Sequence, residues 1–216
     1  IHGLLKHYIP DCGLKRNFMV LLNSSAHQIY WLGRYLMRVK FAASHLPFTE
    51  DEKATRFAAA FGLVIENAEL LNHYMLDKKQ TFSLLNQLII AKDNIQELRG
   101  ILSSHAYAEL NNVINTLQAQ PDALSKAVEQ CTQILEAEHE DVRLFLHLGQ
   151  KIEQFDIELR FGEDLSVLIS ELDIVVQQLA NLNWENINEN WQALKQQLTW
   201  DAYYTFTQQL ENMFEG

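Results

Sequence analysis

The sequence predicts an all-α protein, a single-domain bundle of about seven helices, and three observations lead to this prediction. The 216 residues include only 3 Pro and 8 Gly, and so few helix-breaking residues favour long helices over short strands and tight turns. Apolar residues recur at helical spacing along most of the chain, and no stretch alternates apolar and polar residues for long enough to predict a strand. Hydrophobic residues make up 48% of the chain, which is enough for one sizeable core.

The first predicted helix covers about residues 23–45. Ser24 or Ser25 is expected to cap it, and Pro47 disfavours helical geometry in the residue before it. A helix that is apolar on two sides belongs inside a bundle rather than on its surface, and this helix has two apolar faces. One face carries Ile29, Leu32, Leu36, Val39, Ala43 and Leu46, and the other carries Tyr30, Met37 and Phe41.

Capping residues and chain breakers delimit the remaining helices. A Thr49–Glu52 capping box is expected to begin the second helix, and Ser103 and Ser104 are expected to cap the fourth. A long fifth segment is expected to start at Pro121 and to stop at Gly162. The expected ranges are 49–76, 82–102, 104–117, 121–161, 164–182, and 184–214 as one or two helices interrupted near Thr199. Residues 1–18 lack a sustained period and are expected to form an N-terminal extension before a domain spanning residues 19–216.

Composition argues against several functional classes. A nucleic-acid-binding protein neutralises phosphates with Lys and Arg, whereas this chain has 17 basic and 28 acidic residues, a net charge of −11 and no basic run. No apolar run approaches the roughly 18–20 residues of a membrane helix, and the first residues lack the order of a signal peptide, so we expect a cytoplasmic protein with no membrane segment. Cys12 and Cys131 are expected to be free thiols.

An internal repeat relates the first helix to the fifth segment. A shift of 116 residues aligns Leu32-Gly33 with Leu148-Gly149 and aligns the first apolar stripe with apolar residues throughout. Glycine inside a helix costs about 1 kcal/mol relative to alanine, so two glycines at equivalent positions indicate a structural requirement. We expect a pseudo-repeat whose two central helices approach closely, with a pseudo-twofold axis as one arrangement that fits.

Residues 31–38, WLGRYLMR, resemble the signature of the Alpha-E family of bacterial helical proteins, which is named for a recurring Glu-Arg motif. Weaker similarity extends over about residues 22–172 and includes the segment AKDN at residues 91–94. The first copy of the motif keeps both arginines but has Met37 where the family has Glu. The second copy has Gln150 and Gln154 where the family has Arg, so each copy has lost half of the Glu-Arg pair.

The resemblance implies a helical domain of uncharacterised function. Such proteins tend to be encoded beside ATP-grasp ligases and transglutaminase-like proteases. The resemblance therefore implies a role in peptide synthesis or modification, with an ATP-grasp ligase or a transglutaminase-like protease as the partner. Homo-oligomer formation stays open.

The candidate binding residues come from the two copies of the motif. In the structural interpretation, Arg34 or Arg38 pairs with Glu153, because an unpaired buried arginine is very costly. In the functional interpretation, the arginines line a cleft between the repeats and bind a carboxylate or phosphate through their planar guanidinium groups. The full candidate set is Arg34, Arg38, Glu153, Asp156 and Arg160.

Two other features, a Glu-x-x-His pattern and an aromatic C-terminal part, each have a functional and a structural explanation. Glu136 and His139 form a Glu-x-x-His pattern on an expected helix, the local unit of di-iron bundles, but the chain has no second such unit. A solvated acidic stretch is therefore favoured, and no metal or other cofactor is expected. The aromatic C-terminal part, with Trp184, Trp191 and Tyr204, is interpreted as core packing, with a partner-docking face as the alternative.

Two functional hypotheses follow. The leading one is a non-catalytic helical module that scaffolds a partner enzyme or presents a peptide. The alternative is a peptide- or small-molecule-modifying enzyme whose site is the Arg/Glu/Asp cleft between the repeats. A scaffold predicts a conspicuous apolar surface patch, whereas an enzyme predicts a polar pocket with perturbed pKa values.

Overall fold

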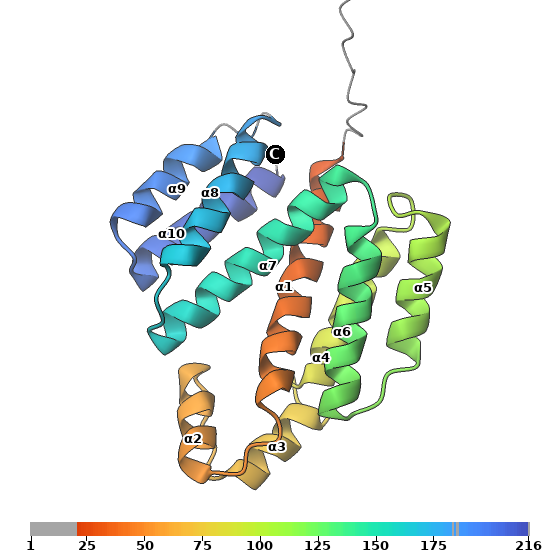
Figure 1. The fold of residues 1–216 in the computed structure, drawn as a ribbon, viewed down its shortest axis with the longest axis vertical. Helices are drawn as coiled ribbons and strands as arrows, with labels where there is room; N and C mark the ends of the chain where they lie inside the picture. Colours follow the sequence, from red (N-terminus) through yellow and green to blue (C-terminus); the bar gives the residue numbers. More distant parts are fainter. Residues whose placement is uncertain (1–20, 183, 185, 216) are drawn as a thin grey trace, which may run out of the picture.

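A computed structural model describes residues 21–182, 184 and 186–215, which form ten helices and no strand (Figure 1). The all-α prediction is confirmed, and the predicted number of about seven helices is corrected to ten over these residues. The helices are α1 (Asn23–His45), α2 (Asp51–Ala60), α3 (Ala68–Leu76), α4 (Leu84–Glu97), α5 (Ser104–Asn115), α6 (Pro121–Glu136), α7 (Glu140–Phe161), α8 (Ser166–Ala180), α9 (Asn186–Gln196) and α10 (Trp200–Glu215). The expected extension at residues 1–18, with Cys12, lies outside the described residues.

Several expected helix boundaries are confirmed. Helix α1 has the predicted range, and Leu46, just before Pro47, is extended with a ψ of 144°. The Ser103 hydroxyl accepts a hydrogen bond from the Ala106 N–H at 3.1 Å and so caps α5. Helix α7 ends at Gly162, which takes the left-handed conformation with a φ of 68°. The predicted interruption near Thr199 separates α9 from α10.

Two segments predicted as single helices are each divided in two. Residues 49–76 form α2 and α3, because Gly62 takes a φ of 71° after α2 and the Asn67 side chain accepts from the Leu70 N–H at 2.9 Å to begin α3. Residues 121–161 form α6 and α7, with His139 as the N-cap of α7.

The expected N-terminal caps of the first two helices are wrong. The N-cap of α1 is Leu22 and that of α2 is Glu50, and neither makes a side-chain capping bond. Both helices instead begin without the local hydrogen bond that Ser24 or Thr49 was expected to supply.

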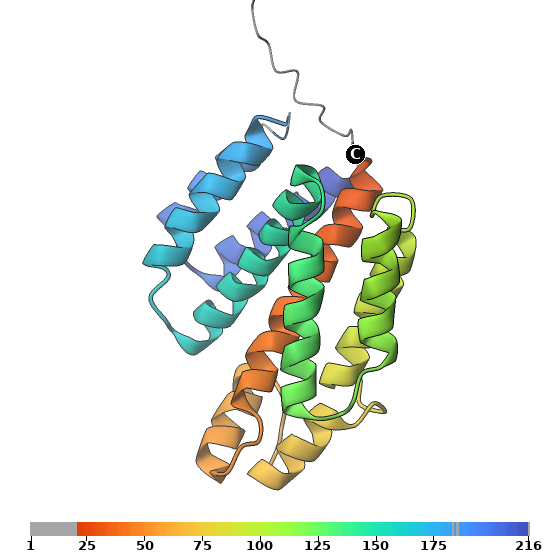
Figure 2. The same ribbon diagram turned by 45° about the vertical axis from the view of Figure 1, so that its right-hand side comes forward.

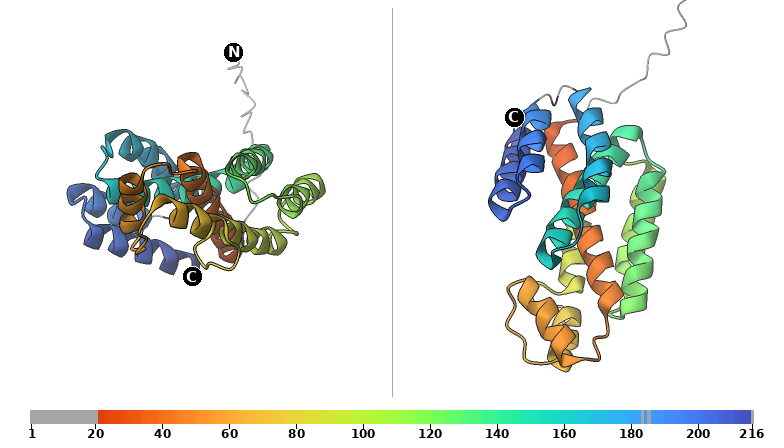
Figure 3. Two further views of the ribbon diagram at one scale, coloured as in Figure 1. Left: turned by 90° about the horizontal axis from the view of Figure 1, so that it is seen from below. Right: turned by 60° about the vertical axis from the view of Figure 1, so that its left-hand side comes forward.

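Helix α1 is the centre of the molecule. It contacts α4 and α6 on one side and α7 and α10 on the other. Figures 1 and 2 show α4, α5 and α6 running alongside α1, whereas α8, α9 and α10 accompany α7, which crosses α1 obliquely. Helices α2 and α3 pair with each other at the C-terminal end of α1 (Figure 3).

The crossing of α1 and α7 is built on two glycines. A Cβ atom at Gly33 would lie 2.4 Å from the Leu146 carbonyl oxygen, and one at Gly149 would lie 1.9 Å from the Tyr30 carbonyl oxygen. The predicted close approach of the two helices is therefore confirmed. These two contacts exchange under the 116-residue shift, as a local twofold relation requires. The pseudo-repeat of the remaining helices stays a prediction.

One contiguous hydrophobic core joins residues from α1 to α10. The C-terminal aromatic residues contribute to it, since Trp191 and Tyr203 are buried, whereas Tyr204 is 56% exposed. Core packing thus accounts for most of the aromatic spacing in this region. None of the described helices is both long and apolar enough to cross a membrane.

Candidate functional site

All five candidate residues from the two motif copies line a single pocket of about 340 Å³. Arg34 and Arg38 project from α1, and Glu153, Asp156 and Arg160 project from α7. The lining residues of α1 and α7 follow the crossing toward the C-terminal ends of the two helices, and Figure 1 shows α2 near the C-terminal end of α7. Residues of α2, α3, α4 and α10 complete its lining.

Helical spacing explains why these side chains converge. Residues three or four apart share one face of a helix, which applies to Arg34 and Arg38 on α1 and to Glu153, Asp156 and Arg160 on α7. The glycine crossing lies next to these residues, since Gly33 directly precedes Arg34 and Gly149 lies one turn before Glu153. The charged faces of the two helices therefore meet just beyond the crossing.

The innermost charge cluster is one carboxylate held by two guanidinium groups. Glu153 is only 1% exposed, and it accepts from Arg34 Nε at 2.9 Å and from Arg38 Nε at 2.5 Å and Nη2 at 2.8 Å. Burial alone raises the pKa of Glu153, but Arg38 and Arg34 outweigh it, so the pKa lies below its usual range. The predicted structural pairing with Glu153 is confirmed, and it involves both arginines.

Two tyrosines extend the cluster behind Arg34. Its Nη1 lies 3.3 Å from the Tyr30 hydroxyl and its Nη2 lies 3.5 Å from the Tyr203 hydroxyl. Burial raises the pKa of Tyr30 to about 12 and also raises that of Tyr203, against the opposing charge of Arg34. Both phenols therefore stay neutral at physiological pH.

The second ion pair connects α7 to α2. Arg160 donates to Asp156 from Nε at 2.5 Å and from Nη2 at 3.1 Å, and its Nη1 donates to the Ala60 carbonyl at 3.0 Å. The Arg160 guanidinium also lies 4.9 Å from the Trp200 ring centroid and 5.5 Å from that of Phe61. This arginine thus holds the C-terminal end of α2 against α7 and α10.

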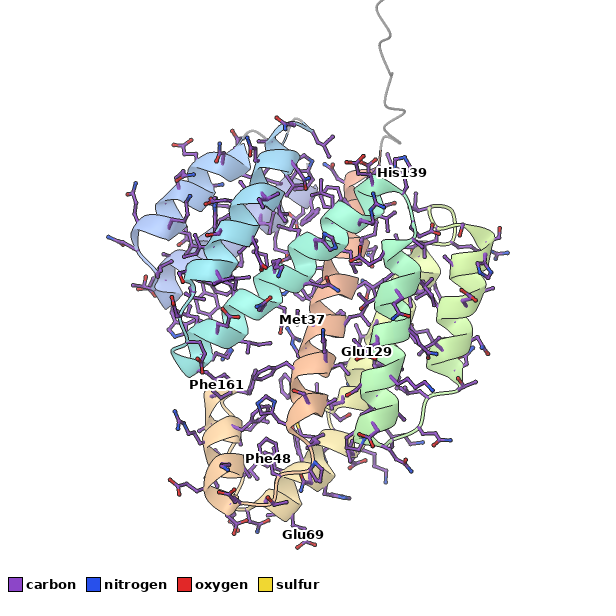
Figure 4. The ribbon with its side chains drawn as sticks, in the orientation of Figure 1. Met37, Phe48, Glu69, Glu129, His139 and Phe161 are labelled. Carbon is purple, nitrogen blue, oxygen red and sulfur yellow. The ribbon has the colours of Figure 1, made fainter. Side chains whose placement is uncertain are left out.

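One part of the pocket lining is apolar. Apart from Ala42 of α1, it comes from α2, α3, the connections that follow them, and the start of α4, which the sequence-based interpretation did not assign to the site. Phe82 remains 59% exposed, so apolar surface at the pocket rim is open to solvent. Figure 4 shows Phe161 at the end of α7, close to α2. The apolar lining consists of Ala42, Phe57, Phe61, Leu63, Met75, Phe82 and Leu84.

The charges lining the pocket do not cancel. Its titratable residues include three arginines but only two carboxylates, which leaves one excess positive charge within a chain of net charge −11. Gln87, which is 5% exposed, accepts from Arg38 Nη1 at 3.2 Å and places an uncharged amide beside the cation. The site is therefore one pocket whose lining combines a group of charged residues, with one excess positive charge, and a group of apolar residues.

The Glu-x-x-His pattern does not lie on one helix, which corrects that expectation. Glu136 ends α6 and His139 precedes α7, and the Glu136 carboxylate contacts His147 Nε2 at 2.5 Å instead. Among the described residues, no group of three or more His, Cys, Asp or Glu side chains is placed to hold a metal ion. Cys131 is a buried free thiol, and burial raises its pKa to about 12.

Comparison with known proteins gives one match. The profile of Alpha-E, described as a predicted alpha-helical domain with a conserved ER motif, matches residues 21–173. The matched region includes both helices that carry the charged residues of the pocket, but it ends within α8. No curated protein and no solved structure matches the chain.

Proposed function

Since the chain belongs to the Alpha-E family of helical domains, we propose that it is a non-catalytic binding module whose pocket holds an anionic ligand. The observation that carries this proposal is the excess cation in a pocket that also has an apolar wall. Ligand sites are concave, largely apolar and equipped with a few placed polar groups, and this pocket has that composition.

Arg38 is the residue best suited to contact the ligand. Its side chain is 31% exposed, whereas that of Arg34 is 11% exposed. A guanidinium has five N–H groups, and the contacts of Arg38 with Glu153 and Gln87 use three of them. The other two are available to an anion, and a guanidinium binds carboxylates and phosphates through two parallel bonds.

The pKa shifts favour binding over proton transfer. A general acid or base works best when its pKa lies near the operating pH. In this pocket the pKa of Glu153 is lowered and the pKa values of Tyr30 and Tyr203 are raised, so each shift moves away from neutrality. The enzyme alternative keeps support from the polar pocket with perturbed pKa values, but the direction of the shifts supports fixed charges that hold a ligand.

The proposed setting is the one that the family resemblance implies. The module would present a bound peptide to an ATP-grasp ligase or a transglutaminase-like protease in the bacterial cytoplasm. Affinity purification of the tagged chain from its source cells, followed by mass spectrometry, tests this setting. Recovery of either enzyme in stoichiometric amount supports this setting. Recovery of the tagged chain alone contradicts the proposed partner but does not bear on ligand binding by the pocket, which has a separate test.

The pocket is tested by thermal unfolding of the purified protein against carboxylates, phosphate esters, sulfonates and their neutral analogues. We expect at least one anion to raise the Tm of the native protein and of Arg56→Gln, an exposed control, but not that of Arg38→Gln. Analysis of the ligand after incubation should recover it unchanged. A chemically altered ligand would favour the enzyme alternative, and the absence of a shift with every anion would contradict the proposal.

A further inference from the structure

The charge of the pocket indicates how much negative charge a ligand carries. Three arginines face two carboxylates, so one added negative charge neutralises the lining. A ligand with two negative charges leaves an uncompensated charge in a partly buried site, within a chain that is already acidic. The balance therefore favours a monoanion over a dianion.

The donors available to that anion lie next to each other. Gln87 accepts from Arg38 Nη1 at 3.2 Å, so its amide is adjacent to the guanidinium. Gln87 is 5% exposed and lines the pocket, and among the described residues its side chain hydrogen-bonds only through Oε1, to Arg38, so its Nε2 donor is available to a ligand. A carboxylate is planar and has two oxygens, one for the guanidinium of Arg38 and one for the amide of Gln87.

The apolar lining of the pocket indicates which kind of group the carboxylate carries. Phe57 of α2, Phe61 at its C-terminal end and Met75 of α3 line the same pocket as the arginines of α1 and α7, and the Phe61 ring lies beside Arg160. A volume of about 340 Å³ lies at the small end of the range for ligand pockets, which is roughly 300–1,000 Å³. It therefore accommodates one apolar side chain rather than a large cofactor.

We propose that the ligand is a monocarboxylate carrying an adjacent apolar side chain, bound by Arg38 and Gln87 and enclosed by an aromatic wall formed by Phe57 of α2 and Phe61 at its C-terminal end. This inference rests on the proposed function, because it specifies the anion that the module holds. The same chemistry occurs in an N-acylated apolar amino acid and at the C-terminus of a peptide that ends in such a residue. Arg160, which donates to the Ala60 carbonyl, positions α2 as the wall.

Calorimetric titration with matched probes tests the ligand class. N-acetyl-L-phenylalanine is expected to bind at least about tenfold more tightly than its neutral amide, than acetate and than phenyl phosphate, because each of these lacks one matched feature. The tripeptide N-acetyl-Gly-Ala-Phe, which is a monoanion like the acetylated amino acid, and its C-terminal amide distinguish the two sources. Tighter binding of the tripeptide than of the acetylated amino acid indicates a peptide terminus, and the reverse order indicates a small acid.

Three variants assign the contacts. Gln87→Glu places a negative charge beside Arg38, where the pair can form an ion pair and keep the fold, and it should abolish carboxylate binding. Phe82→Ala, at an exposed rim position, should weaken binding of acetylphenylalanine but not of acetate. Arg56→Gln should change neither. Circular dichroism and Tm establish that each variant is folded.

The outcomes separate this inference from the proposed function. Tighter binding of phenyl phosphate than of acetylphenylalanine overturns the carboxylate class and leaves an anion-binding module. Equal binding of acetylphenylalanine and its amide overturns both proposals. If no probe binds at millimolar concentration, this inference is overturned. The thermal-unfolding measurements with carboxylates, phosphate esters and sulfonates then test the proposed function separately. Unchanged carboxylate binding by folded Gln87→Glu overturns the assigned contacts.

Discussion

At the scale of single residues, Glu153 determines the charge arrangement of the pocket. It is the common partner of Arg34 and Arg38, and it is almost fully buried. Removing one member of a buried ion pair leaves an uncompensated charge, which costs about 3–5 kcal/mol. We expect Glu153→Gln to lower the free energy of unfolding by that amount, measured by urea denaturation followed by circular dichroism.

The matched control is Glu50→Gln, which removes an ion pair with Lys53 whose two side chains are 58% and 69% exposed. Exposed pairs contribute at most about 1 kcal/mol, so this variant should differ little from the native protein. A loss at Glu153 no larger than that at Glu50 would mean that the cluster does not stabilise the fold.

The same carboxylate gives the protein a pH-dependent stability. Because the pKa of Glu153 is lower in the folded protein than in the unfolded chain, its contribution is present above the unfolded value of about 4.3. That contribution is lost as the pH falls through the folded pKa. We expect the urea midpoint of the native protein to fall below about pH 4.3 more steeply than that of Glu153→Gln, which has no carboxylate to protonate. Parallel pH profiles would contradict this assignment.

Residues of the pocket differ in how far the sequence predicts them. Pairing of Arg34 or Arg38 with Glu153 was predicted from the two copies of the motif and from the cost of an unpaired buried arginine. Gln87 and Tyr203 could not be assigned in this way, because they come from α4 and α10. Local periodicity indicates which face of a helix is buried, but it does not indicate which other helix covers that face.

At the scale of helices, the α1–α7 crossing depends on the absence of two Cβ atoms. A Cβ at Gly149 meets the Tyr30 backbone at 1.9 Å, which forces the helices apart, and Gly33→Ala meets Leu146 in the same way. We expect each substitution to destabilise the protein by about 2–3 kcal/mol or more, as overpacking does. Urea denaturation measures the loss.

Gly100→Ala provides the control for this crossing, since a Cβ there meets nothing within 4 Å. Its effect should stay within about 0.5 kcal/mol or be slightly stabilising. If all three glycine variants have the same stability, the close approach of α1 and α7 does not depend on the glycines.

Helix boundaries show where sequence patterns have strong physical signals. Gly162 was recognised because a left-handed residue after a helix favours glycine. Gly62 and Asn67 carry comparable signals, but the apolar run of residues 63–65 between them conceals the break. The break before α7 has neither Gly nor Pro, and His139 is a weak predictor of an N-cap. That break was therefore not predictable from local residues.

At the scale of the whole molecule, two groups of helices share the α1–α7 crossing. The family match ends at residue 173, yet α10 lies beyond it and supplies Tyr203, Tyr204 and Thr207 to the pocket. The shared part of the chain thus provides the charges, and the part beyond the match completes the enclosure. Tyr203 also reaches the cluster itself, because its hydroxyl lies 3.5 Å from Arg34 Nη2.

This arrangement predicts unequal local stability, because helices that bury more residues open less readily. Helix α7 buries 12 of its 22 residues, whereas α2 buries only Ala54, Phe57 and Ala58 and is tied to α7 by Arg160. We expect hydrogen exchange to be slowest in α1 and α7 and faster in α2. Arg160→Gln should accelerate exchange in α2 without changing α5, on the far side of α1. Equal protection of α2 and α7 in the native protein would mean that the aromatic wall is as rigid as the crossing, and a ligand would then enter without displacement of α2.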